Sequence, residues 1–408
     1  MTNTLKPRDA KDVETAVQWA AAEGRALEIV GRGTKRALGR PAQSDVTLDL
    51  SGLSGVTLYE PEELVLSARA GTPLAEIEPL LARSNQELAF EPMDYGPLLG
   101  GAAGEASIGG VLAANVSGPR RLKAGAARDH FLGFTAVSGR GETFKSGGRV
   151  VKNVTGYDLC KLIAGSWGTL AAMTSVTVKT LPRAETESTL VLRGLPESMA
   201  ITAMTAAMGS SCDVSGAAFL PTRIASQTLT ELDPGASATV LRLEGVAPSV
   251  THRLKTLSEA LKQFGAIATI ESERSRALWK AVRDVKPFAA DGPAGAFPVW
   301  RIATAPTRGA DLAQRIADRV DAEFIYDWAG GLIWAVLAPS DDAGEAIVRE
   351  AVEACGGHAT LIRAPAAIRA MVPVFSPEDA ALAELTQRVK QSFDPRGLLN
   401  PGRMWAGV

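Results

Sequence analysis

The sequence has few of the residues that hold metals or redox clusters. Its three cysteines, Cys160, Cys212 and Cys355, form no C-x-x-C pair, and its three histidines show no H-x-H or H-x-x-x-H spacing. An iron–sulfur cluster takes about four cysteine ligands, and a structural zinc site draws on closely spaced Cys and His. The spacing therefore excludes a self-contained cluster, predicts no metal site and argues against a disulfide framework.

An excess of charge of one sign is also lacking. The chain has 43 basic and 45 acidic residues and a formal net charge of -2, which argues against nucleic acid and anionic membranes as partners. No apolar run of about 18 residues could span a bilayer, and the N-terminal stretch has no apolar signal-peptide region. We expect a cytoplasmic protein without an integral membrane segment.

Two nucleotide-binding motifs are absent as well. No G-x-x-x-x-G-K-[ST] loop is present. The turn Gly31-Arg32-Gly33-Thr34-Lys35 follows a predicted strand, but Arg36 stands where a dinucleotide-binding G-x-G-x-x-G turn has its third glycine. The turn is therefore either a nest of backbone N–H groups for a phosphate or a plain tight turn.

Glycine is abundant in one segment, residues 96–148, which holds 13 of the 40 glycines. Glycine is costly to order unless the backbone needs a positive φ or a close approach to a ligand. Within the segment, Ser107-Ile108-Gly109-Gly110 opens a short predicted helix, whose free N–H groups favour anions. Basic residues follow that could offset a diphosphate, bind a carboxylate or form a solvated surface: Arg120, Arg121, Lys123 and Arg128.

The hydrophobic pattern predicts two regions that meet near residue 184. In the first, a helix over 9–23 precedes a strand at 27–30, and a hairpin over 134–145 precedes a strand at 170–181. The second is expected to follow the ferredoxin-like order βαββαβ, and the pattern predicts that this order occurs twice. The expected elements are 188–193, 196–208, 216–220, 238–244, 249–264 and 266–270, then 302–305, 311–320, 323–327, 332–337, 341–355 and 359–363, and a last helix at 378–393.

Further motifs add a family resemblance. S-I-G-G-x-x-A-x-N from Ser107, K-N-x-x-G-Y-D-L from Lys152, G-S-x-G-T-L from Gly165 and D-P-x-G-x-L-N-P-G from Asp394 join the N-terminal turn. Together they resemble FAD-linked oxidases of the vanillyl-alcohol-oxidase type, whose flavin domain has the PCMH-type fold. The combination of G-P-R-R with K-N-V-x-G-Y-D-L is most similar to the FAD-binding subunits of bacterial glycolate oxidases.

The resemblance implies an α+β fold in three parts. A PCMH-type FAD-binding domain with two subdomains would cover 1–184, a ferredoxin-like α+β cap domain 185–392, and a tail packing on the FAD domain 393–408. It implies a subunit of a complex that oxidises glycolate or another small 2-hydroxy acid to glyoxylate or its homologue. The partners would be a second flavin subunit and an iron–sulfur subunit that takes the electrons, and contact with the inner membrane would be peripheral and through these partners.

The resemblance also implies a set of cofactor-binding residues. Gly31, Arg32, Gly33, Thr34 and Lys35 would hold the FAD pyrophosphate, and Ser107, Gly109, Gly110, Ala114 and Gly118 would line the diphosphate and isoalloxazine, with Arg121 and Arg128 as basic contacts. Lys152, Tyr157 and Asp158 would approach the flavin, Thr169 and Leu170 would lie beside the adenine, and Asn400 would lie near the isoalloxazine.

Departures from the family pattern qualify these expectations. The N-terminal turn has neither His nor Cys to anchor the flavin, so we expect non-covalent FAD. The motif H-G-x-G-x-x-H of single-chain 2-hydroxy-acid dehydrogenases is absent, so His252 and His358 are expected to be structural or exposed and the catalytic residues stay unassigned. The alternatives are a cofactor-free scaffold of the same fold and a free-standing FAD-linked oxidoreductase such as a cell-wall-precursor reductase.

Overall fold

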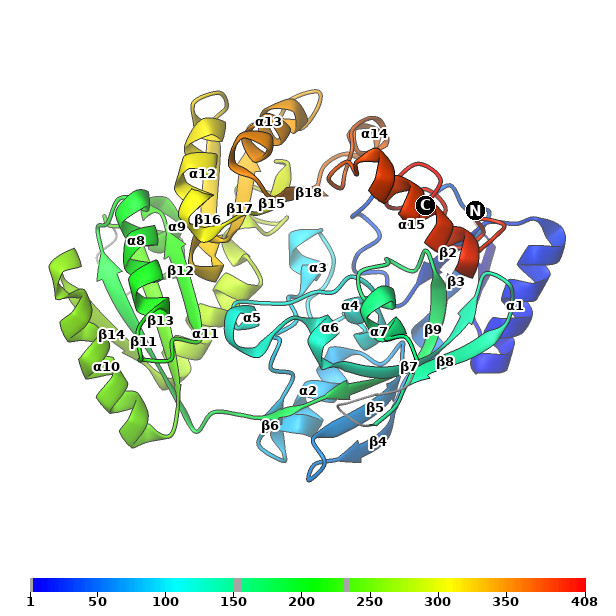
Figure 1. Cartoon of the computed structure of the whole chain (residues 1–408), viewed down its shortest axis with the longest axis horizontal. Coiled ribbons are helices and arrows are strands. Elements are labelled where there is room, and N and C mark those ends of the chain that lie inside the picture. The colour runs from blue at the N-terminus through cyan, green and yellow to red at the C-terminus, as the bar shows by residue number, and fades with distance from the viewer. Residues whose placement is uncertain (1–2, 150–155, 230–234) are drawn as a thin grey trace. The chain divides into compact units, whose positions relative to one another are not determined.

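The computed structural model describes residues 3–149, 156–229 and 235–408, so Lys152 lies outside the described residues. The chain forms two compact units (Figure 1). Unit 1 consists of Met1–Ser117, Gly125–Arg183 and Pro373–Val408, and unit 2 consists of Gly118–Ala124 and Ala184–Val372.

Unit 1 contains two main sheets. In the smaller, the order is β1-β3-β2 and both pairings are parallel; in the larger, the order is β4-β5-β9-β7-β8 and neighbours are antiparallel. The strands are β1 (Asn3–Leu5), β2 (Leu27–Val30), β3 (Val46–Asp49), β4 (Val56–Glu60), β5 (Val65–Arg69), β6 (Gln86–Glu87), β7 (Phe131–Ser138), β8 (Thr143–Gly147), β9 (Ala171–Lys179) and β10 (Leu181–Pro182). The helices are α1 (Ala10–Glu23), α2 (Leu74–Ala82), α3 (Tyr95–Leu98), α4 (Ile108–Ala113), α6 (Ala127–His130), α7 (Leu159–Ile163) and α15 (Ala380–Phe393), with a 3-10 turn at Leu50–Gly52.

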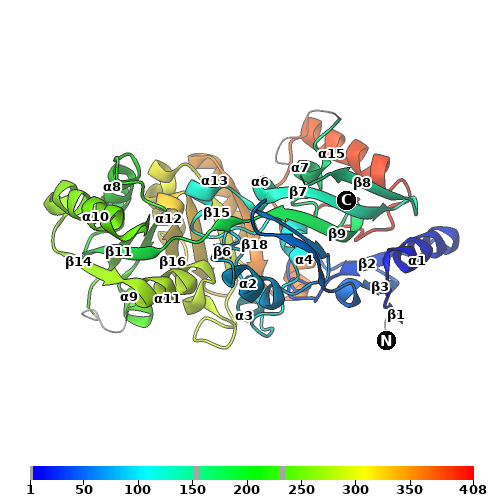
Figure 2. The same ribbon diagram turned by 90° about the horizontal axis from the view of Figure 1, so that it is seen from below.

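The core under the smaller sheet joins distant parts of the sequence. Asp9 caps α1 by accepting a hydrogen bond from the Asp12 N–H at 2.9 Å. The buried face of α1, including Val13 and Val17, packs against β2, β3 and the C-terminal residues Leu398 and Leu399. Figure 1 shows these N-terminal and C-terminal segments side by side. In Figure 2, α15 lies beside the larger sheet, where Phe393 meets Phe144 of β8 with ring centroids 5.8 Å apart.

Unit 2 is built on one continuous sheet with the order β14-β11-β13-β12-β16-β17-β15-β18. Its strands are β11 (Thr186–Arg193), β12 (Gly216–Leu220), β13 (Ala238–Gly245), β14 (Ile267–Glu271), β15 (Val299–Ala303), β16 (Ala322–Asp327), β17 (Leu332–Leu337) and β18 (His358–Arg363). Its helices are α5 (Arg121–Ala124), α8 (Glu197–Met208), α9 (Thr222–Thr228), α10 (Ala247–Leu261), α11 (Ser272–Arg283), α12 (Gly309–Ala317), α13 (Glu345–Cys355) and α14 (Ala366–Met371), with 3-10 turns at Lys262–Phe264, Lys286–Phe288, Pro306–Arg308 and Trp328–Gly330.

The sheet of unit 2 consists of two halves with the same order of elements. Strands β11–β14 with α8 and α10 form one βαββαβ half, and β15–β18 with α12 and α13 form the other. The halves join edge to edge, where Phe219 of β12 pairs with Tyr326 of β16. The α+β fold class with a ferredoxin-like region is thus confirmed.

The path of the chain differs from the expectation in two places. Gly118–Ala124, which lies inside the first expected domain, belongs to unit 2, and unit 1 resumes at Pro373 rather than at residue 393. The earlier return has a physical reason, because Phe375 packs between Trp167 and Trp405 of unit 1, with ring centroids 5.6 Å and 5.9 Å away. In the described ranges, no helix is both long and apolar enough to cross a membrane.

Candidate cofactor site

The site begins at the turn that follows β2. Gly33 has φ +74°, a left-handed conformation that favours glycine. Gly31 has another constraint, because a Cβ at this position would collide with the Ser107 hydroxyl. The turn therefore lies directly against the start of α4, and the two glycine-bearing segments singled out in the sequence are brought together.

The start of α4 is fixed by its cap and by its packing on β5. Ser107 is 3% exposed, and its Oγ accepts a hydrogen bond from the Gly110 N–H at 3.4 Å. A Cβ at Gly109 would lie 2.7 Å from the Ala70 carbonyl oxygen, so the helix approaches the end of β5 more closely than a larger residue would permit. Bare backbone at Gly109 is thus a packing requirement.

These segments line an open cleft in unit 1. The residues that line it come from the β2 turn, β5, α4, the turn before β9 and the C-terminal tail. They are Ile29, Val30, Gly31, Arg32, Gly33, Thr34, Lys35, Arg36, Leu50, Ala70, Ser107, Gly109, Gly110, Ala113, Ala114, Trp167, Gly168, Ala171, Met173, Asn400 and Arg403.

Lys35 is the buried cation of this cleft. Lys35 is 9% exposed and lines the cleft. Its ammonium lies 3.4 Å from Thr34 Oγ1. In the part of the chain that the structure describes, no carboxylate lies within ion-pair distance of it. Burial lowers the pKa of Lys35 to about 8, although the charge of Asp94 acts in the opposite direction. A buried ammonium of this kind is stabilised by an anion that enters the cleft.

The C-terminal tail forms one wall of the cleft through Asn400. Its N–H donates to the Leu27 carbonyl at 2.9 Å, which extends a parallel bridge between Leu27 and Leu399. Its side chain accepts a hydrogen bond from the Ile29 N–H and donates one to the Trp167 carbonyl, both at 2.7 Å. Asn400 is 3% exposed, so it links β2 to the turn before β9 without contact with water.

A buried ion pair holds the tail in this position. Lys390 of α15 donates to Asp394 Oδ2 at 2.7 Å, to the Thr169 carbonyl at 2.7 Å and to the Leu399 carbonyl at 2.9 Å. Asp394 in turn accepts from the N–H groups of Leu398 and Leu399. Lys390 is 4% exposed and Asp394 1%, so all of these charges are paired inside the protein.

The structure brings many of the predicted cofactor-binding residues into the cleft. They are Gly31, Arg32, Gly33, Thr34, Lys35, Ser107, Gly109, Gly110, Ala114 and Asn400. The sequence interpretation missed Arg403 and Met173 and had not given Trp167 a position in the wall. The Arg403 guanidinium donates to the Lys35 carbonyl at 2.6 Å. Because Arg403 lies three residues beyond Asn400, the tail motif could have indicated that Arg403 also belongs to the cleft.

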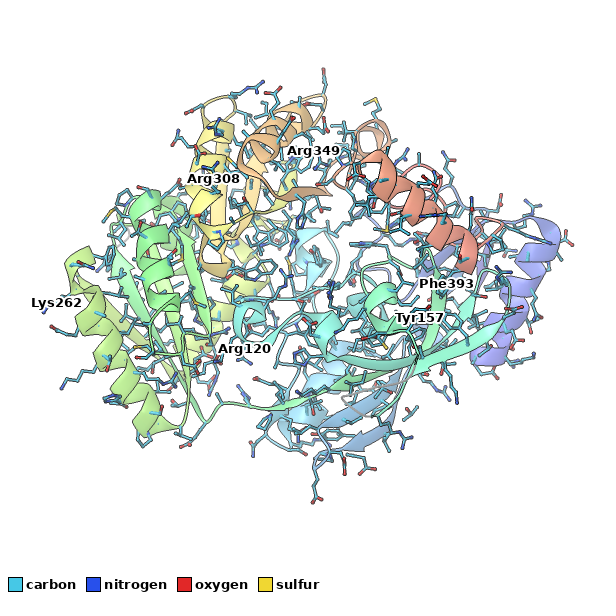
Figure 3. All side chains as sticks on the ribbon, in the orientation of Figure 1. Arg120, Tyr157, Lys262, Arg308, Arg349 and Phe393 are labelled. Carbon is cyan, nitrogen blue, oxygen red and sulfur yellow. The ribbon has the colours of Figure 1, made fainter. Side chains whose placement is uncertain are left out.

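Other predicted residues lie away from the cleft for identifiable reasons. Thr169 and Leu170 are buried behind the wall, where Thr169 Oγ1 donates to the Ser166 carbonyl. Asp158 caps α7 by accepting from the Lys161 N–H, and Tyr157 is 89% exposed (Figure 3).

Three further predicted basic or glycine contacts have other neighbours within their own units. The exposed Arg128 lies 3.9 Å from a carboxylate oxygen of Asp129. Gly118 and Arg121 belong to unit 2, where the Gly118 carbonyl accepts from Trp328 Nε1 and the Arg121 guanidinium lies over the Trp328 ring. Of the predicted basic contacts Lys35, Arg121 and Arg128, Lys35 is the one that lines the cleft as described.

Comparisons with known proteins match nearly the whole chain. Residues 2–147 match a family described as FAD binding domain, and residues 376–404 match FAD linked oxidases, C-terminal domain. The chain is 32% identical over 394 residues to glycolate oxidase subunit GlcE of Escherichia coli, covering 96% of this chain and 95% of that protein. It is 26% identical to glycolate oxidase subunit GlcD of Bacillus subtilis, over 74% of this chain and 68% of that one.

A solved structure shows the same fold at low identity. An alkyldihydroxyacetonephosphate synthase superposes with a TM-score of 0.71 and 16% identity, covering 98% of this chain and 76% of that protein. The two matched families lie at opposite ends of the sequence, and both contribute residues to the cleft of unit 1.

Proposed function

Because the chain belongs to the FAD-linked oxidase family, alongside glycolate oxidase subunits, we propose that it is the flavin-binding subunit of a glycolate-oxidising complex. Its FAD is held without a covalent bond. The complex converts glycolate, or a closely related 2-hydroxy acid, to glyoxylate or the matching 2-oxo acid. The electrons pass to an iron–sulfur partner subunit, with a second flavin subunit in the same assembly.

The observation that carries the proposal is Lys35 in a cleft with glycine-bearing walls. FAD has an anionic diphosphate, and a buried ammonium without a carboxylate within ion-pair distance fits that charge. Gly31 and Gly109 are held against other backbone and side-chain atoms and leave the wall without projecting side chains. The lining residues include no His, Cys or Tyr, which supports non-covalent binding.

The residues of the cleft have separate parts in this function. Lys35 and the turn after β2 hold the diphosphate, and Asn400 fixes the wall formed by the tail. FAD bound in the cleft would supply a two-electron acceptor for oxidation of the acid's C2 alcohol to a carbonyl. Cys160, Cys212 and Cys355 are buried free thiols, too few for a cluster, so the onward acceptor belongs to another chain.

The first experiment is the absorption spectrum of the purified chain. We expect a flavin band at about 450 nm, and FAD in the supernatant after acid precipitation, because the cofactor is not covalently bound. A colourless protein that FAD cannot reconstitute would indicate a scaffold. Bleaching by NADPH in place of glycolate would indicate a reductase.

A pair of glycine variants tests the position of the cofactor. Gly110→Val places a branched side chain on the cleft, where the Cβ would lie 3.1 Å from Ser107 Oγ and 3.7 Å from Lys35 Nζ. We expect loss of FAD with the fold retained by circular dichroism. Gly148→Ala is the matched control, since a Cβ there meets no atom within 4 Å. Normal FAD content in Gly110→Val would refute the site.

A further inference from the structure

The turn that leads from α7 into β9, beside α4 in Figure 1, holds a bulky residue in an unfavourable backbone conformation. Trp167 has φ +54°, in the left-handed region that glycine adopts readily and large side chains do not. Gly165 and Gly168 of the same turn have φ +85° and +73°. Glycine thus occupies two left-handed positions of the turn, and the largest side chain occupies the third. Such strain persists where the surrounding structure imposes it, and it is frequent at ligand-binding sites.

Two hydrogen bonds hold the Trp167 backbone in this conformation. Its N–H donates to the Ala113 carbonyl of α4 at 2.9 Å, and its carbonyl accepts from Asn400 Nδ2 at 2.7 Å. The next residue has little room to adjust, because a Cβ at Gly168 would lie 2.8 Å from the same amide nitrogen. The position of Trp167 is therefore set by α4 and by the C-terminal tail, both of which belong to unit 1.

The indole of Trp167 is supported by two further aromatic side chains. Phe375 packs against it with ring centroids 5.6 Å apart, and Trp405 packs against Phe375 at 5.9 Å. Trp405 is fixed in turn, because its Nε1 donates to the Ser376 carbonyl at 3.1 Å. Trp167 itself is partly exposed and is one of the residues that line the cleft. A supported aromatic side chain therefore forms part of the cleft wall.

Lys35 approaches the first turn of α4, and Trp167 approaches its last residue. A Cβ at Gly110 would lie 3.7 Å from Lys35 Nζ, whereas Trp167 bonds to Ala113, where α4 ends. Both side chains line the same cleft. FAD has a ring system on each side of its diphosphate, the isoalloxazine on one side and the adenine on the other. With the diphosphate at Lys35, one of the two rings extends toward Trp167, whichever way the cofactor lies.

We propose that Trp167 is a contact residue for FAD, with its indole packed against the flat ring system that extends toward it from the diphosphate. The identity of the ligand rests on the proposed function, whereas the contact rests on the strained and supported indole. Indoles pack well on flat heteroaromatic rings, because both bury apolar faces and their π systems attract one another. The strain of the turn is then offset by the contact that places an aromatic side chain in the wall.

The test compares Trp167→Leu with the unaltered chain. FAD is titrated into the FAD-free full chain, and binding is followed by calorimetry. Leucine is apolar but has no flat ring. We expect the Kd for FAD to rise about fivefold to 150-fold, the range for loss of one ring-stacking contact. Trp167→Phe, which restores a flat ring, should recover most of that loss.

Two partial ligands show which ring meets Trp167. FMN carries the isoalloxazine, and ADP carries the adenine with the diphosphate. A loss of affinity in Trp167→Leu for FMN and FAD assigns the contact to the isoalloxazine. Bound flavin should then be more fluorescent in the variant, because an adjacent indole quenches its emission. A loss for ADP and FAD, with flavin fluorescence unchanged, assigns the contact to the adenine. Either result supports the inference.

Two further variants separate a ring contact from a structural role. Trp19→Leu removes a tryptophan of α1 that is 40% exposed and does not line the cleft, so its Kd for FAD should equal that of the unaltered chain. Trp167→Gly removes the indole and relieves the left-handed strain, so it tests the contact if Trp167→Leu does not fold. An indole with only a structural role would lower the Tm in these Trp167 variants and leave the Kd values unchanged, which would overturn the inference.

The outcomes also distinguish this inference from the proposed function. Equal FAD affinity in the unaltered chain and in the folded Trp167 variants overturns the ring contact and leaves the flavin function standing. An unaltered chain that binds ADP or FMN through Trp167 but does not bind FAD supports the ring contact and refutes the proposed function. A chain that binds none of the three ligands refutes both.

Discussion

Replacing Lys35 by methionine should stabilise the FAD-free protein and weaken its hold on FAD. Methionine keeps the unbranched apolar stem and removes the charge. The pKa of Lys35 falls from 10.5 to about 8 on folding, mainly through burial. At about 1.4 kcal/mol per pKa unit, the charged side chain costs unit 1 up to about 3 kcal/mol.

The pH at which this cost is present follows from the direction of the shift. Below about pH 8 the lysine is charged in both folded and unfolded chains, so the folded protein carries the full cost. Between about pH 8 and 10.5 the unfolded chain binds the proton and the folded chain does not. Stability therefore gains from this residue as pH rises through that window, and Lys35→Met lacks the gain.

Cofactor affinity should change in the opposite sense. Loss of a charge-assisted contact costs about 1.5–3 kcal/mol, which raises the Kd for FAD about tenfold to 150-fold. In the unaltered chain, bound diphosphate keeps Lys35 protonated, so FAD affinity should fall as pH rises above about 8. The variant should show no such fall.

Calorimetry of FAD-free protein and a flavin-fluorescence titration measure the two effects. At pH 7 we expect the unit 1 transition of Lys35→Met to move up by about 5–10 °C, and the difference from the unaltered chain to shrink toward pH 10. Lys11→Met is the control, because Lys11 of the same unit is exposed and pairs with Glu14 on the surface. A variant that is less stable than the unaltered chain, or that binds FAD equally well at every pH, would refute the reasoning.

Three further variants test the tail and one predicted residue. Asn400→Ala removes hydrogen bonds to β2 and to the turn before β9, so FAD should dissociate faster and the Tm should fall, by about 1–3 kcal/mol in unfolding free energy by calorimetry. Lys390→Met leaves Asp394 buried without its countercharge and should cost about 3–5 kcal/mol by the same measurement, with partial recovery when Asp394→Asn is added; no recovery would refute the pairing. Tyr157→Phe should leave FAD content within about twofold by absorbance, because its side chain is almost fully exposed; a colourless variant would contradict its position.

The regular elements of unit 2 were accessible to sequence analysis because their pattern is local. Short apolar runs mark strands such as β12 and β17, and the order βαββαβ extends over 86 residues in the first half, Thr186–Glu271, and over 65 in the second, Val299–Arg363. The edge-to-edge joining at Phe219 and Tyr326 is not local, since it depends on which strands of the two halves meet. No periodicity in either strand encodes that choice.

The residues of the candidate cofactor site likewise include some that the sequence could identify and some that it could not. Glycines 31, 33 and 109 could be identified because glycine at those places answers a backbone requirement. The burial of Lys35 could not be predicted from the sequence, because a lysine in a turn is usually solvated. It becomes buried here only through packing around the turn after β2. The position of Arg121 also escaped prediction, because the segment around it leaves one unit and joins the other.

His358 illustrates a neighbour relation that strand pairing creates and that the sequence pattern does not contain. The sequence interpretation expected it to be structural or exposed, and it does begin β18 as an exposed residue. Pairing of β18 with β15 brings it to the same face as Arg301, which lies 57 positions earlier in the sequence. A motif search for closely spaced histidines has no access to such a pairing.

The division of unit 1 between both ends of the sequence has a consequence for how the protein is made. The ribosome completes the β2 turn and α4 early, but Asn400 and Lys390 emerge only after all of unit 2 has been synthesised. Domains generally fold in order of synthesis. Unit 2 can therefore fold on the ribosome while the cofactor cleft still lacks a wall, and a nascent chain interrupted before Pro373 would hold a folded unit 2 and a cleft in unit 1 that lacks the wall formed by the tail.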